Sequence, residues 1–460
     1  MLVPTATIVQ TITELAPLIA CSRASAASLV ERCLAQIAAR DGELRAFITV
    51  LAEEASRNAR QADEEIRGGR YRGPLHGIPI SIKDLIDVRG VPTTAASRLR
   101  AGHVAPGDAP VVAHLREAGA IIIGKCNLHE FAYGTTSEDS AFGAVRNPHD
   151  LSRSAGGSSG GSAAAVVAGM SLGSVGTDTG GSIRIPSAAC GTVGLKPGYG
   201  EVSCDGVVAL SRSLDHVGPL AASVADAWLL YDALRGVPRA KAPAVEDRAP
   251  LGGLRLGVLR PYFLELLDHE VREQFEGALD RLQQAGVRVL ATSVAHAALV
   301  PHVYLLVQLP ESSAYHAATV EARPQGYSPA VRLRLEMGRY VLAEDYVRAA
   351  RGRDVLRREV DEALAECDAL VLPTLPIPAP PLGASSVPVG NTRGPVRGLM
   401  LRETQLFNLT GHPAVSIPCG ATRAGLPCGL QMVGHRSGTH ELLRVAFSCE
   451  PTVNPQAPRA

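Results

Sequence analysis

The 460-residue sequence has no paired cysteines, no dense run of basic residues and no long stretch of large apolar residues. Its nine cysteines form no C-x-x-C pair, which argues against a disulfide framework or a zinc ribbon and favours buried free thiols in a reducing compartment. Lys plus Arg and Asp plus Glu number 45 each, and no run of five Lys or Arg occurs. Bulk charge therefore gives no reason to expect a nucleic-acid or anionic-membrane partner.

The sequence also lacks recognisable targeting and membrane segments. Near the start, Glu14 interrupts the one apolar stretch, and no basic start precedes it as in a signal peptide. Residues 154–177 carry no charged side chain, but their Gly and Ser content and their lack of Leu, Ile and Phe argue against a spanning helix. We therefore expect a cytoplasmic protein with no membrane and no nucleic-acid partner.

Helix and strand patterns alternate along the first half of the chain. Leu29, Cys33 and Ile37 recur at helical spacing behind Ser25, a residue type suited to an N-cap. The segment HGIPISIKDLID places isoleucines at every second position, as in a strand, and delivers Lys83 at its end. Such alternation predicts an α/β layered fold.

Composition changes suggest how the rest of the chain is arranged. Residues 236–250 are rich in Pro, Ala and charge and predict a surface linker, whereas residues 384–395 resemble a loop. Two late strands, PAVSIP and GLPCGLQMVG, are expected to return to the same sheet. We expect one domain over 1–460, with a core of about 60–235 and 367–450 and a mainly helical cleft region of about 260–366.

The Gly- and Ser-rich residues 154–198 are the main candidate for a functional site, because dense glycines let backbone N–H groups approach a ligand. A P-loop needs G-x-x-x-x-G-K-[ST], and no lysine lies between Lys125 and Lys196. The G-x-S-x-G pattern of a hydrolase elbow is met twice within 156–161, although residues 146–155 before it do not read as a strand. Downstream histidines such as His216 keep this elbow alternative open.

A longer set of motifs resembles the amidase signature family. The matching segments, in chain order, are HGIPISIKD, GAIIIGKCNLHEFAYG, FGAVRNP, GGSSGGSAAAVVAG, GTDTGGSIRIPSAACGTVGLKP, SLDHVGPL, NLTGHPAVSIPCG and GLPCGLQMVG. The resemblance implies an α/β fold of the amidase-signature type, with a large twisted mixed β-sheet covered by helices on both faces. It also implies hydrolysis without a metal or an organic cofactor.

The resemblance further implies a Ser–Ser–Lys triad. Lys83 would be the base, Ser158 the bridging serine on a cis peptide bond, and Ser182 the nucleophile. These residue types suit the chemistry, because a serine hydroxyl needs a base and a lysine is a base only when burial lowers its pKa. Taken singly, Lys83 would be a solvated lysine and the two serines would be turn or cap residues.

Supporting residues surround the expected nucleophile. The resemblance places the oxyanion hole on the backbone N–H groups of Thr179, Gly180, Gly181 and Ser182. Asp178 and Arg184 would hold this turn, in the manner of a structural ion pair. Tyr133 would line the acyl side of the cleft, although a packing role suits it nearly as well.

We expect from these features an amidase that hydrolyses a C–N bond of a small apolar or aryl amide and, by extension, an ester or carbamate (urethane), as a monomer or homodimer. The apolar and aromatic side chains of Val303, Leu305, Tyr315 and Tyr340 favour that substrate class. The alternative is a glutamyl-tRNA(Gln) amidotransferase subunit that needs partner chains.

Overall fold

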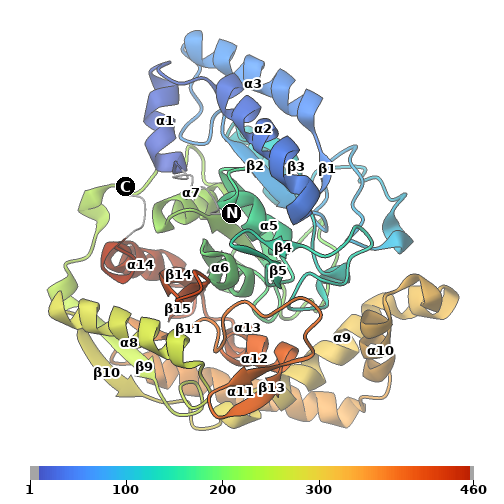
Figure 1. The fold of residues 1–460 in the computed structure, drawn as a ribbon, viewed down its shortest axis with the longest axis vertical. Coiled ribbons are helices and arrows are strands. Elements are labelled where there is room, and N and C mark those ends of the chain that lie inside the picture. Colours follow the sequence, from blue (N-terminus) through green and yellow to red (C-terminus); the bar gives the residue numbers. More distant parts are fainter. Residues whose placement is uncertain (1–9, 456–460) are drawn as a thin grey trace.

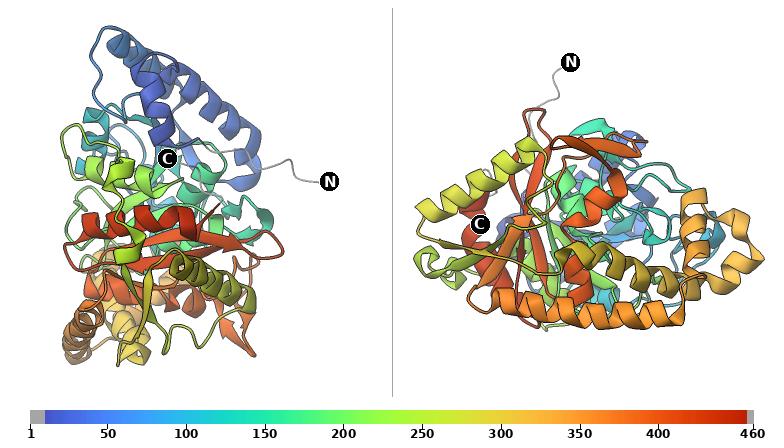
Figure 2. Two further views of the ribbon diagram at one scale, coloured as in Figure 1. Left: turned by 90° about the vertical axis from the view of Figure 1, so that its left-hand side faces the viewer. Right: turned by 90° about the horizontal axis from the view of Figure 1, so that it is seen from below.

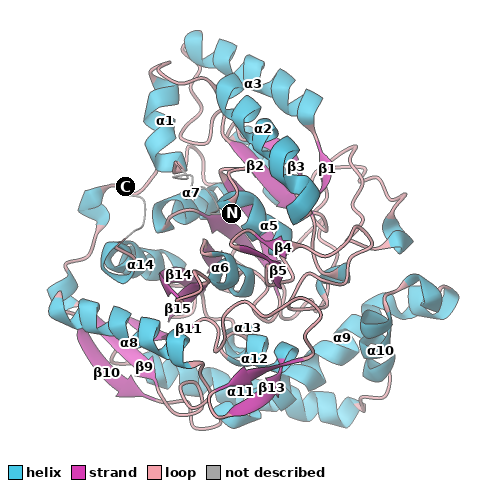
Figure 3. Cartoon of the chain, viewed as in Figure 1, coloured by secondary structure: helices cyan, strands magenta, loops and turns pink. Residues whose placement is uncertain are grey.

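The computed structural model describes residues 10–455, which form a mixed α/β structure around one large sheet (Figures 1 and 3). The sheet has 11 strands in the order β1-β3-β2-β6-β8-β7-β14-β15-β11-β9-β10. Its strands are β1 Phe47–Val50, β2 Pro79–Lys83, β3 Ile121–Cys126, β6 Gly173–Asp178, β7 Val193–Lys196, β8 His216–Ala221, β9 Arg255–Leu259, β10 Arg288–Thr292, β11 Ala369–Pro373, β14 Ala414–Ala421 and β15 Pro427–Val433. The α/β sheet architecture expected from the sequence is confirmed.

Helices surround this sheet, and two short strand pairs lie outside it. The helices are α1 Ile12–Ala20, α2 Ala26–Leu44, α3 Ala52–Arg67, α4 Pro110–Glu117, α5 Gly160–Val167, α6 Arg184–Cys190, α7 Val224–Leu234, α8 His269–Gln284, α9 Val300–Ala322, α10 Pro329–Gly338, α11 Ala343–Leu364, α12 Val396–Arg402, α13 Gln405–Thr410 and α14 Thr439–Val453. The strand pairs are β4 Arg146–Asn147 with β5 Asp150–Ser154, and β12 Ser386–Val389 with β13 Thr392–Pro395.

The centre of the sheet places two functional segments at one edge. Strands β2 and β6 are parallel neighbours, with Ile80 opposite Gly173 and Ile82 opposite Val175. Because parallel strands end on the same side, Lys83 at the end of β2 and Asp178 at the end of β6 emerge together. Every residue of both strands is buried, and except for the terminal Lys83 and Asp178 their side chains are small or apolar.

Helices cover both faces of β6. A Cβ on Gly173 would meet Leu230 of α7, whereas a Cβ on Gly176 would meet Ser159, the residue just before α5. Positions 173 and 176 differ by an odd number, so they point to opposite faces of the strand. Helix α5 therefore packs on one face and α7 on the other, which is the layer arrangement that the resemblance implies.

The helices between residues 300 and 364 lie together on one side of the molecule. In the right-hand view of Figure 2, α9 and α11 run beside each other, and α10 packs against α9. Helix α9 also packs on α13, which leads into the last two strands of the sheet. This helical layer contributes Tyr304, which reaches the turn after β6.

Two local expectations from the sequence are wrong. Residues 384–395, expected to be a loop, contain the whole β12–β13 hairpin, with Val387 opposite Gly394. Residues 146–155, expected not to contain a strand, include β4 and β5. Both pairs are short: β4–β5 is largely polar, and the alternating Val387 and Val389 of β12 are too few to identify a strand by pattern alone. The cysteines are free, and most of them are buried.

The small residues of α5 allow it to approach the sheet closely, which gives a testable consequence. A Cβ on Gly161 would overlap the carbonyl oxygens of Ala46 and Asn127, and backbone atoms cannot move aside as side chains do. We expect Gly161→Ala to lower the free energy of unfolding by about 2 kcal/mol, measured by urea denaturation.

Gly277→Ala is the matched control for this helix substitution. It also changes a helical glycine, in α8, but the added Cβ would come no closer than 3.6 Å to Arg281. This variant should gain about 0.5–1 kcal/mol from helix propensity. Equal effects of the two substitutions would contradict close packing at Gly161.

Candidate active site

Lys83 lies at the end of β2 with no exposed surface. Its Nζ donates hydrogen bonds to Ser158 Oγ at 2.8 Å and to Thr177 Oγ1 at 2.8 Å. Burial lowers the pKa of the Lys83 ammonium to about 7, although the negative charges of Asp178 and Asp215 oppose the shift. A substantial fraction of Lys83 is therefore neutral near pH 7, and a neutral amine can accept a proton.

Ser158 lies two residues before α5 and is also fully buried. The Gly157–Ser158 peptide bond is cis, the conformation that the resemblance implies. The carbonyl oxygen of Ser158 accepts hydrogen bonds from the N–H of His129 and from Ser137 Oγ, both at 3.1 Å. These contacts fix the backbone so that the Ser158 hydroxyl faces Lys83.

The turn after β6 brings Ser182 next to this segment. The N–H of Ser159 donates to the carbonyl oxygen of Ser182 at 3.2 Å, so the two expected catalytic serines lie on adjoining backbone segments. Ser182 is 7 % exposed, whereas Lys83 and Ser158 are 0 % exposed. Of these three side chains, only that of Ser182 is open to an incoming ligand.

The backbone N–H groups expected to form an oxyanion hole fall into two sets. That of Gly181 donates to Asp178 Oδ1 at 2.8 Å and is therefore already engaged. Within residues 10–455, those of Thr179, Gly180 and Ser182 make no hydrogen bond. The structure thus leaves three unengaged donors at this turn.

Glycine is required at two positions of the turn because other side chains pack against it. A Cβ on Gly180 would overlap the hydroxyl of Tyr304 from α9, and one on Gly181 would overlap Thr404 Oγ1. Gly181 also has a φ of 139°, in the region that other residues rarely adopt. The turn is therefore enclosed by segments more than 100 residues away in sequence.

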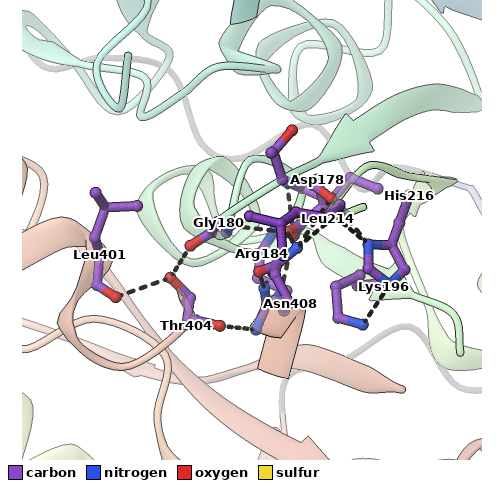
Figure 4. A network of polar contacts seen from close by, with 12 residues as sticks. Asp178, Gly180, Arg184, Lys196, Leu214, His216, Leu401, Thr404 and Asn408 are labelled. Carbon is purple, nitrogen blue, oxygen red and sulfur yellow. Dashed lines mark hydrogen bonds and ion pairs between the residues drawn. The ribbon is translucent and has the colours of Figure 1, made fainter. Parts of the chain in front are cut away.

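Asp178 and Arg184 form the buried ion pair that holds the turn (Figure 4). Arg184 Nη2 and Asp178 Oδ1 are 2.9 Å apart, and neither side chain is exposed. Asp178 also accepts from the N–H of Ile183 at 3.1 Å. Burial alone would raise the pKa of Asp178, but the charges of Arg184 and Lys196 hold it well below its usual range.

Sequence reasoning missed the residues that complete this network. Arg184 Nη1 donates to Gln431 Oε1 at 2.6 Å, and Nη2 donates to Asn408 Oδ1 at 2.7 Å. Asn408 Nδ2 in turn donates to Asp178 Oδ1 at 2.8 Å. The only signal for Asn408 and Gln431 was their presence in the motifs NLTG and GLQMVG, to which no role could be attached.

A second carboxylate supports the turn from the other side. Thr179 Oγ1 donates to Asp215 Oδ1 at 2.6 Å, and the amides of Leu210 and Ser211 also donate to Asp215. Burial raises the pKa of Asp215 to about 6, despite these hydrogen bonds. Asp215 lies in the SLDHVGPL motif and was not singled out from the sequence.

Tyr133 is buried in the hydrophobic core and also makes polar contacts. Its hydroxyl accepts from Ser312 Oγ at 3.2 Å, and its carbonyl oxygen accepts from Arg334 at 2.8 Å. The guanidinium groups of Arg334 and Arg397 lie 5.5 and 5.7 Å from the centre of its ring.

The apolar side chains expected to favour an aryl amide do not gather here. Leu305 is 43 % exposed, Tyr315 42 % and Tyr340 84 %, so each presents much of its surface to solvent. Leu305 and Tyr315 lie on the exposed side of α9 and Tyr340 in the turn between α10 and α11, whereas polar Gln308 and Ser312 are on the buried side of α9. The apolar character of this region was therefore misjudged because sequence alone did not show which helix face is buried.

The geometry bears on two other kinds of site. Strand β5, which precedes the G-x-S-x-G pattern, pairs with β4 in a two-stranded sheet outside the main sheet, whereas an elbow strand belongs to the main sheet. Among residues 10–455, no group of three or more His, Cys, Asp or Glu is placed to hold a metal ion. No helix in that range is long and apolar enough to cross a membrane.

The Asp178–Arg184 pair predicts a large stability effect. Arg184→Leu leaves a buried Asp178 carboxylate without its counter-charge, and we expect a loss of about 3–5 kcal/mol in unfolding free energy by urea denaturation. Arg57→Leu removes an exposed arginine that lies 4.0 Å from Glu53 and should change stability by less than about 0.5 kcal/mol. If Arg184→Leu lowered the unfolding free energy no more than Arg57→Leu does, the turn would not depend on the Asp178–Arg184 pair.

Comparison with known proteins supports one family. A family model described as Amidase matches residues 28–443. The A-type subunit of glutamyl-tRNA(Gln) amidotransferase from Anaeromyxobacter sp. (strain K) is 39 % identical, over 95 % of this chain and 95 % of the relative. A crystal structure of an amidase is 38 % identical with a TM-score of 0.90, covering 96 % of this chain and 99 % of that chain. The crystal structure of the A-type subunit of the same amidotransferase from Thermotoga maritima is 34 % identical with a TM-score of 0.79, covering 96 % and 94 %.

These relatives correct two expectations. Further curated relatives at 37–39 % identity over more than nine-tenths of both chains are also A-type subunits of glutamyl-tRNA(Gln) amidotransferases. A free-standing hydrolase of small apolar or aryl amides, esters or carbamates is therefore the wrong expectation, and the amidotransferase alternative has the better support. The expectation of a monomer or homodimer without a nucleic-acid partner is wrong for the same reason. Balanced overall charge and the exposed apolar side chains had favoured both.

The motifs, the mixed sheet and the match over residues 28–443 agree with one another. The chain belongs to the amidase signature family, and it is an enzyme that acts on carbon–nitrogen bonds other than peptide bonds.

Proposed function

We propose that the chain is the A-type subunit of a glutamyl-tRNA(Gln) amidotransferase, which releases ammonia from a carboxamide for use by partner subunits on the tRNA. The observation that carries the proposal is the 37–39 % identity to such subunits along nearly the whole of both chains. The Ser312 hydroxyl and the Arg334 guanidinium beside Tyr133 would also offer polar partners to a carboxamide. The protein would work in the cytoplasm, where tRNA is charged.

In this proposal, Ser182 is the nucleophile. Its Oγ attacks the carboxamide carbon while its proton passes to Ser158 Oγ, and the proton of Ser158 passes to neutral Lys83 Nζ. The 2.8 Å hydrogen bond between Lys83 and Ser158 supports the second transfer. The lowered pKa of Lys83 supports its role as the final acceptor.

The tetrahedral intermediate places a negative charge beside the turn after β6. We infer that the unengaged N–H groups of Thr179, Gly180 and Ser182 stabilise this oxyanion, each by about 3–4 kcal/mol. Collapse of the intermediate breaks the C–N bond, the leaving nitrogen takes a proton back from the Lys83–Ser158 pair, and ammonia departs. Water then cleaves the acyl-enzyme ester at Ser182 and releases the acid.

The complex provides the test of this function. Affinity-tagged chain recovered from the cells that produce it should carry partner subunits, and the complex should convert glutamyl-tRNA(Gln) to glutaminyl-tRNA(Gln) with glutamine as the carboxamide. Ser182→Ala should lower this rate at least about 10³-fold, because the remaining donors cannot replace the nucleophile.

Two controls define the contradicting outcomes. Ser159→Ala changes the neighbouring serine of the G-x-S-x-G pattern and should retain covalent labelling by a fluorophosphonate, which Ser182→Ala should lose. Labelling that follows Ser159 instead would favour an elbow nucleophile. The amidotransferase function would be contradicted if the purified chain alone hydrolysed free amides and the chain recovered with its partners did not amidate glutamyl-tRNA(Gln).

The pKa of Lys83 gives a pH prediction. Only neutral lysine accepts the proton, so kcat/KM should rise about tenfold per pH unit below pH 7 and level off above it. Lys83→Arg should be inactive across pH 6–9, because a guanidinium keeps its proton throughout this range. A kcat/KM profile that is flat around pH 7 or that inflects far from pH 7 would contradict the role of Lys83 as base. Activity in the Lys83→Arg variant would contradict it as well.

A further inference from the structure

A cavity that does not include Lys83, Ser158 or Ser182 has three arginines in its lining. Its volume is about 350 Å³, and its lining includes Arg353, Arg357, Arg436, Tyr199, Thr410 and Gly411. No carboxylate is among the lining residues that the structure describes. Three guanidinium groups around one open cavity are the donor set that proteins use for phosphate.

The protein itself satisfies these guanidinium groups only in part. Arg357 Nη1 donates to Asp354 at 2.8 Å, and Arg436 Nε lies 3.4 Å from Asp361. Within the part of the chain that the structure describes, Arg353 has no carboxylate partner and donates only to the carbonyl oxygens of Leu409 and Ser213. Because each guanidinium has five N–H donors, most donors around the cavity remain available to a ligand.

Arg353 and Arg357 carry like charges that repel each other. Burial lowers the pKa of Arg353 most and the charge of Arg357 lowers it further, whereas Glu311, Tyr199 and Asp354 oppose the shift. An anion between the two guanidinium groups would relieve their repulsion.

Helix α13 connects the cavity to the turn after β6. At its C-terminal end, the carbonyl oxygens of Leu409 and Thr410 accept hydrogen bonds from Arg353 and Arg357. One residue earlier, Asn408 Nδ2 donates to the carbonyl oxygen of Asp178 at 3.0 Å. Just before the helix, Thr404 Oγ1 donates to the carbonyl oxygen of Gly180 at 2.6 Å (Figure 4). A shift of this single helical segment would therefore act on the turn at both Asp178 and Gly180.

We propose that this three-arginine cavity binds a phosphate group and that α13 transmits its occupancy to the turn formed by residues 178–182. A phosphate competes with the carbonyl oxygens of Leu409 and Thr410 for Arg353 and Arg357. Any rearrangement of those hydrogen bonds moves the helix that carries Asn408.

Binding is tested by titration calorimetry of the full chain with inorganic phosphate. The unmodified chain should bind one equivalent, and Arg357→Gln combined with Arg436→Gln should weaken binding at least tenfold. Arg358→Gln removes the same charge at a position next to Arg357 but outside the cavity lining, and it should bind as the unmodified chain does. Should the double variant fail to fold, Arg436→Gln alone serves, because that side chain is half exposed. The absence of binding, or equal binding by the variants, would overturn the site.

Transmission is tested by amide hydrogen exchange, which needs no catalytic activity. Phosphate should change the exchange rate of the 178–184 peptide at least twofold in the unmodified chain, and it should have no such effect in the double variant. A change confined to peptides that line the cavity would overturn the role of α13. Because neither readout involves turnover, their failure is distinguishable from failure of the proposed amidotransferase function.

The source of the phosphate is resolved by a parallel titration with tRNA(Gln), an arm that rests on the proposed function. Weaker tRNA binding by the double variant, with no change for Arg358→Gln, would assign the cavity to a backbone phosphodiester. Loss of inorganic phosphate binding alone would assign it to a small free phosphate. Either result supports the cavity as a phosphate site.

Discussion

The buried pair of Asp178 and Arg184 is the interaction on which the candidate active site depends. Both charges lie away from solvent, where an unpaired charge would be costly, so each requires partners. Asp178 obtains them from backbone N–H groups of the turn and Arg184 from side chains near the end of the chain. The shape of the turn therefore depends on the packing of the C-terminal segment against it.

The position of Lys83 follows from the same region of the sheet. Parallel strands β2 and β6 deliver Lys83 and Asp178 to one edge, and the small residues of α5 allow Ser158 to lie against them. Burial that lowers the pKa of Lys83 is thus a product of sheet topology rather than of any one neighbour. The charge of Asp178 opposes that shift, and its pairing with Arg184 limits how strongly it does so.

The sequence predicts the local part of this site well and the long-range part poorly. Strand β2, helix α2 and the turn after β6 follow from periodicity and glycine placement, and the motifs correctly indicated the family. The contacts of Arg184 with Asn408 and Gln431 join positions more than 200 residues apart, and no local pattern encodes such a distance. The same limit explains the misjudged 300–364 helices, where exposed and buried apolar residues look alike until the packing is known.

The distribution of partners along the chain has a consequence for biosynthesis. Lys83, Ser158 and Ser182 all leave the ribosome well before Thr404, Asn408 and Gln431, the distant residues that hold Arg184. A nascent chain that ends before these residues contains every candidate catalytic side chain, yet its Arg184 lacks them. The order of synthesis therefore delays the complete hydrogen-bond network of Arg184 until residues 404–431 have emerged.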